Sequence, residues 1–163
     1  MPRQRLVRGT KDIMKALMVA AEDYTEATGR ALRAEGETII EDAGMRTPVK
    51  TGRLRATRHV TDPVRGRIVG VEISYPDKER YGPGDRAQVI GVKTDGSKDV
   101  VSVGLGYGTD YAVYVHERTE LHHDVGEAKF LEKAVQAHLA GMANRVGARV
   151  RRETLTRKYR WRR

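Results

Sequence analysis

At positions 46–55 the chain reads Arg46-Thr47-Pro48-Val49-Lys50-Thr51-Gly52-Arg53-Leu54-Arg55, and this stretch divides a helical pattern from a pattern of strands. Pro48 disfavours helical backbone at the residue before it and has no N–H group, so the preceding helix should end near Met45. Gly52 permits backbone conformations that other residues resist. Local physics therefore predicts a polar helix-to-strand corner.

The segment before the corner has the spacing of an amphipathic helix. We expect this helix to begin with Thr10 as its N-cap, after a short polar arm at residues 1–9. Gly29 and Gly36 should kink or break it, because glycine weakens a helix by roughly 1 kcal/mol relative to alanine. Apolar or small residues recur at mostly helical spacing, at Ile13, Leu17, Ala20, Ala21, Tyr24, Ala27, Ala31, Leu32, Ile39 and Ala43.

After the corner, short runs of β-branched residues separated by turn residues predict strands. Asp95-Gly96 lies between two such runs and predicts a hairpin turn over residues 94–97. No helical crossover separates the runs, so the sheet should be antiparallel and meandering. We expect strands within residues 56–60, 64–75, 87–93 and 98–105, and a polar loop over residues 76–85.

The last third of the chain returns to helical spacing. We expect a short helix over residues 111–118 and a capping box at Asp124-Val125-Gly126-Glu127. A second helix should follow over residues 130–146, and residues 151–163 should be flexible. The sequence thus predicts an α+β fold, with a long N-terminal helix and a C-terminal helix packed on an antiparallel sheet. It predicts one domain at residues 1–150 and a basic C-terminal extension at residues 151–163.

Composition excludes several classes of function. The chain has 163 residues, which suits one domain, and its 39% hydrophobic and 6% aromatic residues allow only a modest core. The absence of cysteine excludes disulfides, thiolate metal sites and thiol nucleophiles, and fits a reducing compartment. No apolar run reaches the roughly 20 residues of a membrane span, and the N-terminal residues do not have the pattern of a signal peptide.

Positive charge is concentrated at the C-terminus. The chain has a net charge of +9, of which residues 145–163 carry +8. Tyr159 and Trp161 lie among these cations, a mixture that suits phosphate contacts with base stacking. It equally suits docking on an acidic protein surface, or a solvated tail without a partner.

The candidates for catalysis are grouped in one short stretch at His116, Glu117, His122, His123 and Asp124. A catalytic zinc needs about three protein ligands, but the second histidine of a helical zinc motif is replaced here by Glu120. The glycines at residues 104–108 match neither a phosphate loop nor a dinucleotide fingerprint. We therefore expect no catalytic, cofactor-binding or metal-binding residues and no enzymatic activity.

Three phrases occur in an order that resembles the head–tail joining proteins of tailed bacteriophages, small neck proteins also called tail-completion, connector or minor tail proteins. The first is residues 47–55, which are similar to the family's Pro, apolar residue, polar residue, Thr-Gly, basic residue and Leu. The others are Tyr111-Ala112-Val113-Tyr114-Val115 and the pair Phe130-Leu131. The chain departs from the family at residues 118–120, where Phe-Gly-Thr is frequent, and at Lys129, where Pro is frequent.

The resemblance implies two helices against an antiparallel sheet, no catalysis, and assembly into a ring around the DNA channel, expected to be a hexamer. The protein would be made in the host cytoplasm and lie in the neck of the virion, away from any membrane. Its partners would be the portal or connector and the tail proteins, with DNA as a further contact through the channel. The basic tail lies outside the resemblance, and its own residues suggest a contact with DNA. We expect subunit or partner contacts at Arg53, Arg55, Tyr111, Tyr114, Arg151, Arg152, Tyr159 and Trp161.

Two other functions stay open at this point. The first is a stand-alone nucleic-acid-binding protein that acts through its basic tail, with an affinity that falls steeply with salt. The second is a small hydrolase built around His116, Glu117 and His123.

Overall fold

A computed structural model describes residues 3–74 and 86–160, and within them the side chains of residues 11, 13–74 and 86–156. It has an α+β fold, as the sequence predicted. The helices are α1 (Arg3–Arg46), α2 (Arg53–Ala56), α3 (Ala112–Glu117), α4 (Phe130–Leu139) and α5 (Met142–Arg160). The strands are β1 (Arg58–Val60), β2 (Val64–Arg65), β3 (Ile68–Ser74), β4 (Gln88–Thr94), β5 (Val101–Ser102) and β6 (Leu105–Tyr107).

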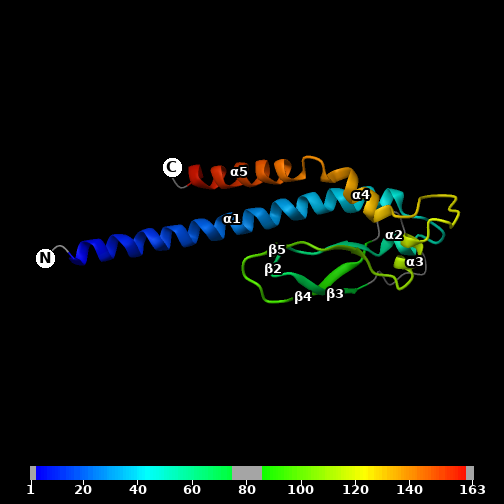
Figure 1. Cartoon of the computed structure of the whole chain (residues 1–163), viewed down its shortest axis with the longest axis horizontal. Helices are drawn as coiled ribbons and strands as arrows, with labels where there is room; N and C mark the ends of the chain where they lie inside the picture. The colour runs from blue at the N-terminus through cyan, green and yellow to red at the C-terminus, as the bar shows by residue number, and fades with distance from the viewer. Residues whose placement is uncertain (1–2, 75–85, 161–163) are drawn as a thin grey trace.

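Helix α1 is the central element of the fold. α5 lies along one side of it and the strands along the other, while α2, α3 and α4 gather at its C-terminal end (Figure 1). Its N-terminal turns extend beyond the other labelled elements. α1 ends at Arg46, as Pro48 predicted, but it begins at Arg3, so the predicted N-cap at Thr10 is wrong.

The two glycines predicted to break α1 mark close contacts with the strand region. A Cβ atom at Gly29 would lie 2.7 Å from Cβ of Pro63, and one at Gly36 would lie 2.9 Å from Cδ2 of Leu105. α1 is continuous through both positions, so the predicted kink or break is wrong. Glycine stands there because another segment approaches the helix backbone, and that packing offsets its weak helix propensity.

The six strands pair in a nested order as one interrupted antiparallel ribbon. β1 pairs with β6, β2 with β5, and β3 with β4. The predicted hairpin over residues 94–97 is therefore wrong: β4 pairs with β3, and β5 pairs with β2. The connection between β3 and β4 includes residues 75–85, which lie outside the described part of the chain. The polar loop predicted at residues 76–85 falls within this range.

The hydrogen bonds of Asp95 explain why residues 94–97 have the sequence of a turn although they do not close a hairpin. Its carboxylate accepts hydrogen bonds from the backbone N–H groups of Arg67, at 2.9 Å, and Ser97, at 3.0 Å. The hydrogen bonds from Ser97 and Arg67 lower the pKa of Asp95. The hydrogen bond from Arg67 therefore ties Asp95, on the limb formed by β4, β5 and β6, to the opposite limb, and the chain continues along its own limb into β5.

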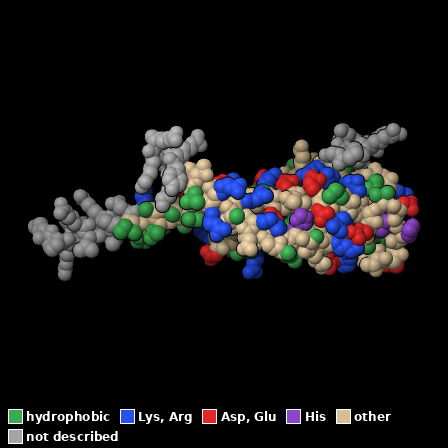
Figure 2. All heavy atoms as spheres, turned by 90° about the horizontal axis from the view of Figure 1, so that it is seen from above, with side chains coloured by type: hydrophobic (Ala, Val, Ile, Leu, Met, Phe, Trp, Pro, Cys, Tyr) green, Lys and Arg blue, Asp and Glu red, His purple; other side chains and the backbone are tan. Residues whose placement is uncertain are grey.

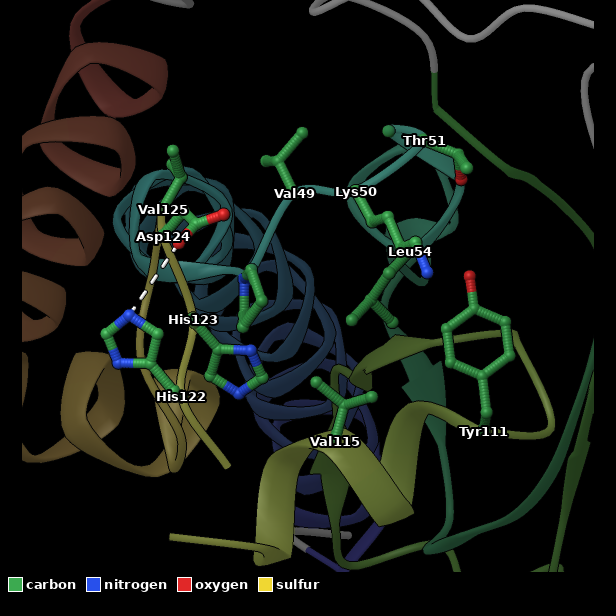
Figure 3. A pocket seen from close by; sticks show the side chains of 12 residues that line it. Val49, Lys50, Thr51, Leu54, Tyr111, Val115, His122, His123, Asp124 and Val125 are labelled. Carbon is green, nitrogen blue, oxygen red and sulfur yellow. Dashed lines mark ion pairs between the residues drawn. The ribbon is translucent and has the colours of Figure 1, made fainter. Parts of the chain in front are cut away.

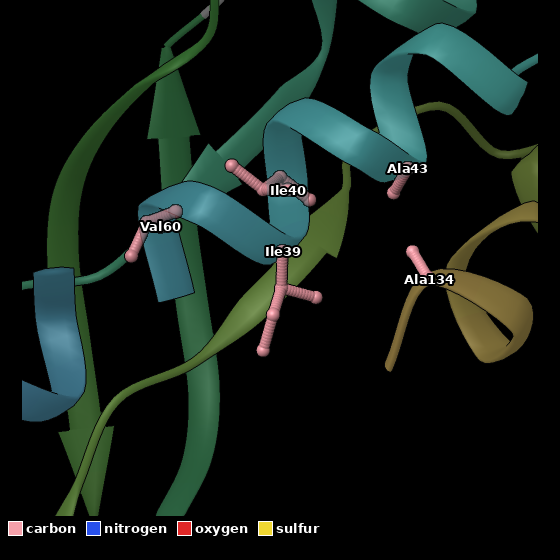
Figure 4. Packing of buried hydrophobic residues seen from close by; sticks show 5 residues of the cluster. All are labelled: Ile39, Ile40, Ala43, Val60 and Ala134. Atoms are coloured by element: carbon pink, nitrogen blue, oxygen red, sulfur yellow. The ribbon is translucent and has the colours of Figure 1, made fainter. Parts of the chain in front are cut away.

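The main core lies where α1, the ribbon and α4 meet. Its buried members are Ile39, Ile40, Ala43, Val60 and Ala134 (Figure 4). A second cluster of Leu54, Ala112 and Phe130 joins α2, α3 and α4. Tyr107 packs against both clusters, and its ring meets Phe130 edge to face with the centroids 4.9 Å apart.

The C-terminal region forms two helices where the sequence predicted one. The chain reverses at Gly141, whose φ of 73° favours glycine, and α5 then runs back along α1 (Figure 1). Arg145 fixes this return because its guanidinium pairs with the buried Glu35 of α1 and donates to the carbonyl oxygens of His138 and Ala140.

The predicted flexible extension is helical over most of its length. α5 continues without interruption past residue 150 to Arg160, so the expectation of flexibility is wrong for residues 151–160. Glu153 lies in this part and pairs with Arg30 of α1, with Nε and Oε1 2.5 Å apart. Residues 161–163 lie outside the described part of the chain.

No stretch of helix within residues 3–74 and 86–160 has the length and apolarity required to span a bilayer.

A matched pair of glycine substitutions tests the role of Gly29. Gly29→Ala should lower the free energy of unfolding by about 1–2 kcal/mol, because the collision with Pro63 outweighs the gain in helix propensity. Gly147→Ala in α5 has no neighbour within 4 Å and should raise it by about 0.5–1 kcal/mol. Urea unfolding of both variants makes the comparison. A stabilised Gly29→Ala variant would contradict the close approach.

His59 gives the fold a dependence on pH. It is buried on β1, and burial lowers its pKa below the ordinary value of 6.5. The unfolded state therefore binds more protons in this range, so stability should fall as the pH drops below about 6.5. Urea unfolding between about pH 7.5 and about pH 5 should show this loss of stability. The His59→Leu variant should lack the contribution of His59 to the loss. An identical slope in both proteins would show that other groups are responsible.

Candidate interaction site at the end of the long helix

The C-terminal end of α1 is capped by groups from three other parts of the chain. Thr47 is fully buried, and its hydroxyl donates to the Ala43 carbonyl oxygen at 2.7 Å. The backbone N–H of Glu127 donates to the Arg46 carbonyl oxygen at 2.8 Å, and Arg55 Nη2 donates to the Thr47 carbonyl oxygen at 3.1 Å. These bonds satisfy carbonyl groups that a helix end leaves without intrahelical partners.

The segment 125–127 lies directly against this corner. The Val49 N–H donates to the Val125 carbonyl oxygen at 3.3 Å, and Gly126 has a φ of 89°. A Cβ at Gly126 would lie 2.5 Å from the backbone nitrogen of Pro48. Only glycine satisfies both the positive φ and this approach.

Glu127 holds the same segment by its charge. Its carboxylate pairs with Lys133 and with Arg46, where Nη1 and Oε1 are 3.0 Å apart. Hydrogen bonds from Lys133 and then Arg46 lower the pKa of Glu127. The predicted capping box at residues 124–127 is therefore wrong: α4 begins at Phe130, after Lys129, and Glu127 faces α1 instead.

A cleft of about 510 Å³ opens between the corner, α3 and the 122–125 segment. Apolar side chains and Tyr111 form much of its lining, and Lys50 and Thr51 add polar groups (Figure 3). The His123 ring turns toward Val115, and within the described part of the chain its buried Nε2 atom has no hydrogen-bond partner. Apolar surface with a few polar groups suits the binding of a side chain or a short peptide.

The other members of the predicted catalytic group have structural partners. The His116 ring meets Phe130 edge to face, with centroids 4.8 Å apart, and its Nδ1 lies 2.8 Å from Oε1 of Glu117. Glu117 pairs with Lys129, and these hydrogen bonds, first from Lys129 and then from His116, lower its pKa. His122 also lines the cleft, and its Nε2 lies 3.6 Å from Oδ1 of Asp124 (Figure 3).

The described residues contain no group of three or more His, Asp or Glu side chains placed to hold a metal ion. Histidines 116, 122 and 123 therefore do not form a zinc site among themselves within residues 3–74 and 86–160. What the arrangement offers chemically is a binding surface, with hydroxyl, ammonium and imidazole groups around an apolar cleft.

The predicted contact residues fall into two groups. Arg53 and Arg55 of α2, and Tyr111 and Tyr114 on or beside α3, belong to the elements that gather at the C-terminal end of α1. Arg55 is half-buried and donates to the carbonyl oxygens of Met45 and Thr47. Arg151 and Arg152 lie on exposed positions of α5, in the other part of the molecule. The side chain of Tyr159 and the whole of Trp161 lie outside the described residues.

Sequence reasoning missed the contribution of segment 122–126 to this site. Gly126 and Glu127 were interpreted as part of a helix start, because their spacing fits a capping box equally well. The signal that distinguishes the two cases is the positive φ at Gly126, which only the fold reveals. The sequence suggests His123 only as a metal-binding or hydrolytic residue, and nothing in its spacing predicts that it lines an apolar cleft.

No protein-family model, curated protein or solved structure matches this chain. The function is therefore inferred from the residues and their arrangement.

Gly126 provides a direct test of the corner. Gly126→Ala should lower the free energy of unfolding by about 2–3 kcal/mol, because the added Cβ collides with rigid backbone and the φ is unfavourable for alanine. Gly96→Ala is the matched control: it also has a positive φ, of 77°, but no atom within 4 Å of its added Cβ, so it should cost about 1 kcal/mol. Equal losses in urea unfolding would contradict the close packing at Pro48.

Proposed function

We propose that this chain is a structural subunit of the virion of a tailed bacteriophage, assembled with further copies into a ring at the neck, where it joins the portal or connector to the tail. The proposal combines the three ordered sequence phrases with one structural observation. More large hydrophobic side chains are exposed than are buried in the core.

The distribution of large hydrophobic side chains carries the argument. Among the described side chains, sixteen large hydrophobic residues are exposed, whereas the buried hydrophobic set contains only five residues larger than alanine: Ile39, Ile40, Leu54, Val60 and Phe130. Scattered apolar residues are normal on a surface, but an excess over the core is typical of a subunit that completes its packing through neighbours.

The exposed residues lie in places that suit contact with neighbours. Tyr111, Val113 and Tyr114 are exposed on or beside α3 at one end of the molecule, next to the cleft at the corner. Hydrophobic side chains also gather on the projecting part of α1 (Figure 2). A ring needs two different faces on each subunit, and the surface around α3 and the cleft is suited to one of them.

One observation favours the alternative of nucleic-acid binding. Arg149, Arg151 and Arg152 are exposed on α5, and none of them forms an ion pair with another residue in the described part of the chain. Helical arginines in this arrangement suit phosphate contacts. In a neck ring the same arginines would contact DNA in the channel, so the two functions share this feature.

Electron microscopy of phage particles tests the proposal. When the gene for this chain is disrupted, lysates should contain DNA-filled heads separated from tails, or tails of abnormal length, because the joining ring is missing. An intact copy supplied in trans should restore joined particles, which excludes an effect on neighbouring genes. Normal joined particles without the protein would contradict the structural function and favour DNA binding by α5.

A further inference from the structure

We propose that the projecting part of α1, which carries the exposed residues from Ile13 to Tyr24, pairs with the same segment of a second copy. The two helices would lie side by side and antiparallel. This self-association goes beyond the proposed function and can be measured on the isolated protein, so either inference can fail without the other.

The projecting segment exposes one continuous apolar face. Ile13, Met14, Leu17, Met18 and Tyr24 are 55% to 69% exposed, and at 100° per residue they fall on the same side of the helix. The face continues along α1 into Ala27 and Ala31, which the chain itself buries. The second half of this face is thus covered within one copy, and the first half is left bare.

The bare turns of α1 lack the packing that stabilises the rest of the helix. Isolated helices shorter than about 12–15 residues are marginal, and most helical stability in proteins comes from packing of the apolar face. Every described side chain within residues 11–22 is exposed. The same stripe on another copy has matching length and apolar character, and two such helices pack along their apolar faces.

Charge selects the antiparallel orientation. Residues 3–15 contain five Lys or Arg and one acid, whereas residues 22–26 contain three acids and no cation. A parallel pair would place like charges side by side at both ends, whereas an antiparallel pair can place Lys15 and Lys11 of each copy level with Glu22 and Glu26 of the other. Glu22 and Glu26 do contact Arg65 and Arg30 of their own chain, at 3.5 and 3.4 Å, but these pairs are exposed and weak.

The same register also matches side-chain sizes. When Lys15 lies level with Glu22, Leu17 lies level with Ala20 and Ile13 with Tyr24. A large residue opposite Ala20 allows the two helix backbones to approach, as a packed interface requires. Charge and size therefore agree on a two-fold axis between Met18 and Val19.

The mass of the purified full-length protein in solution gives the first test. Light scattering after size-exclusion chromatography at high micromolar concentration should give at least twice the chain mass of 18.3 kDa. Leu17→Glu should weaken self-association at least tenfold, because it places a charge in the paired face. Val19→Glu is the control: Val19 is 54% exposed but lies about 200° around the helix from Leu17, so its self-association should be unchanged.

Crosslinking distinguishes the two orientations, since the chain contains no cysteine and a single introduced thiol is unique. In the antiparallel pair, Met18→Cys lies near the two-fold axis and should crosslink to its counterpart with a reagent that spans about 8 Å, whereas Met14→Cys lies about 14 Å from its counterpart along the axis and should not. In a parallel pair both positions would crosslink.

Three results would overturn the proposal. They are a monomer at every concentration, equal weakening by Leu17→Glu and Val19→Glu, and crosslinking of Met14→Cys as efficient as that of Met18→Cys. Circular dichroism of each variant confirms that the core, which does not include these residues, is intact.

Discussion

The packing of Ile39, Ile40 and Ala43 against Val60 and Ala134 is the contact on which the rest of the structure depends. These residues bring the last turns of α1 together with the first strand of the ribbon and with α4. No other buried hydrophobic cluster in the described part of the chain joins α1 to the ribbon. Because the core is small, the strand region has to lie close to α1. Glycine at positions 29 and 36 permits this close approach, so a small number of side chains fills the space between them.

An ion pair between the exposed Arg145 and the buried Glu35 sets the direction of α5. Glu35 is almost completely buried on α1, and Arg145 reaches it from the first turns of α5. Removing Arg145 would leave the buried carboxylate of Glu35 without its partner, which destabilises the folded chain. Arg145 also binds carbonyl oxygens at the end of α4, so one side chain closes the turn at Gly141 and directs α5 back along α1. The basic C-terminal segment is thereby held on a helix.

The two ends of α1 differ in what they leave uncovered. At the C-terminal end, Thr47, Arg55 and Glu127 satisfy the helix carbonyl groups, and the resulting corner supports a cleft with apolar walls. The N-terminal turns carry an apolar face that no described part of the chain covers. A subunit with a small core, a cleft at one end and a bare helix at the other is suited to assembly, which is the function we propose.

Helices and strands with local signals could be predicted from the sequence alone. Proline at position 48 predicted the end of α1, the apolar spacing predicted the helices, and the β-branched runs predicted antiparallel strands. The sequence also brought Arg53, Tyr111 and Tyr114 into consideration as surface residues. The pairing of the strands, the close contacts at Gly29 and Gly36 inside a continuous helix, and the packing of Gly126 on Pro48 became visible only in the folded chain. The physical reason is that strand pairing and close backbone contacts depend on residues far apart in the chain, while turn and capping patterns report only the nearest few residues.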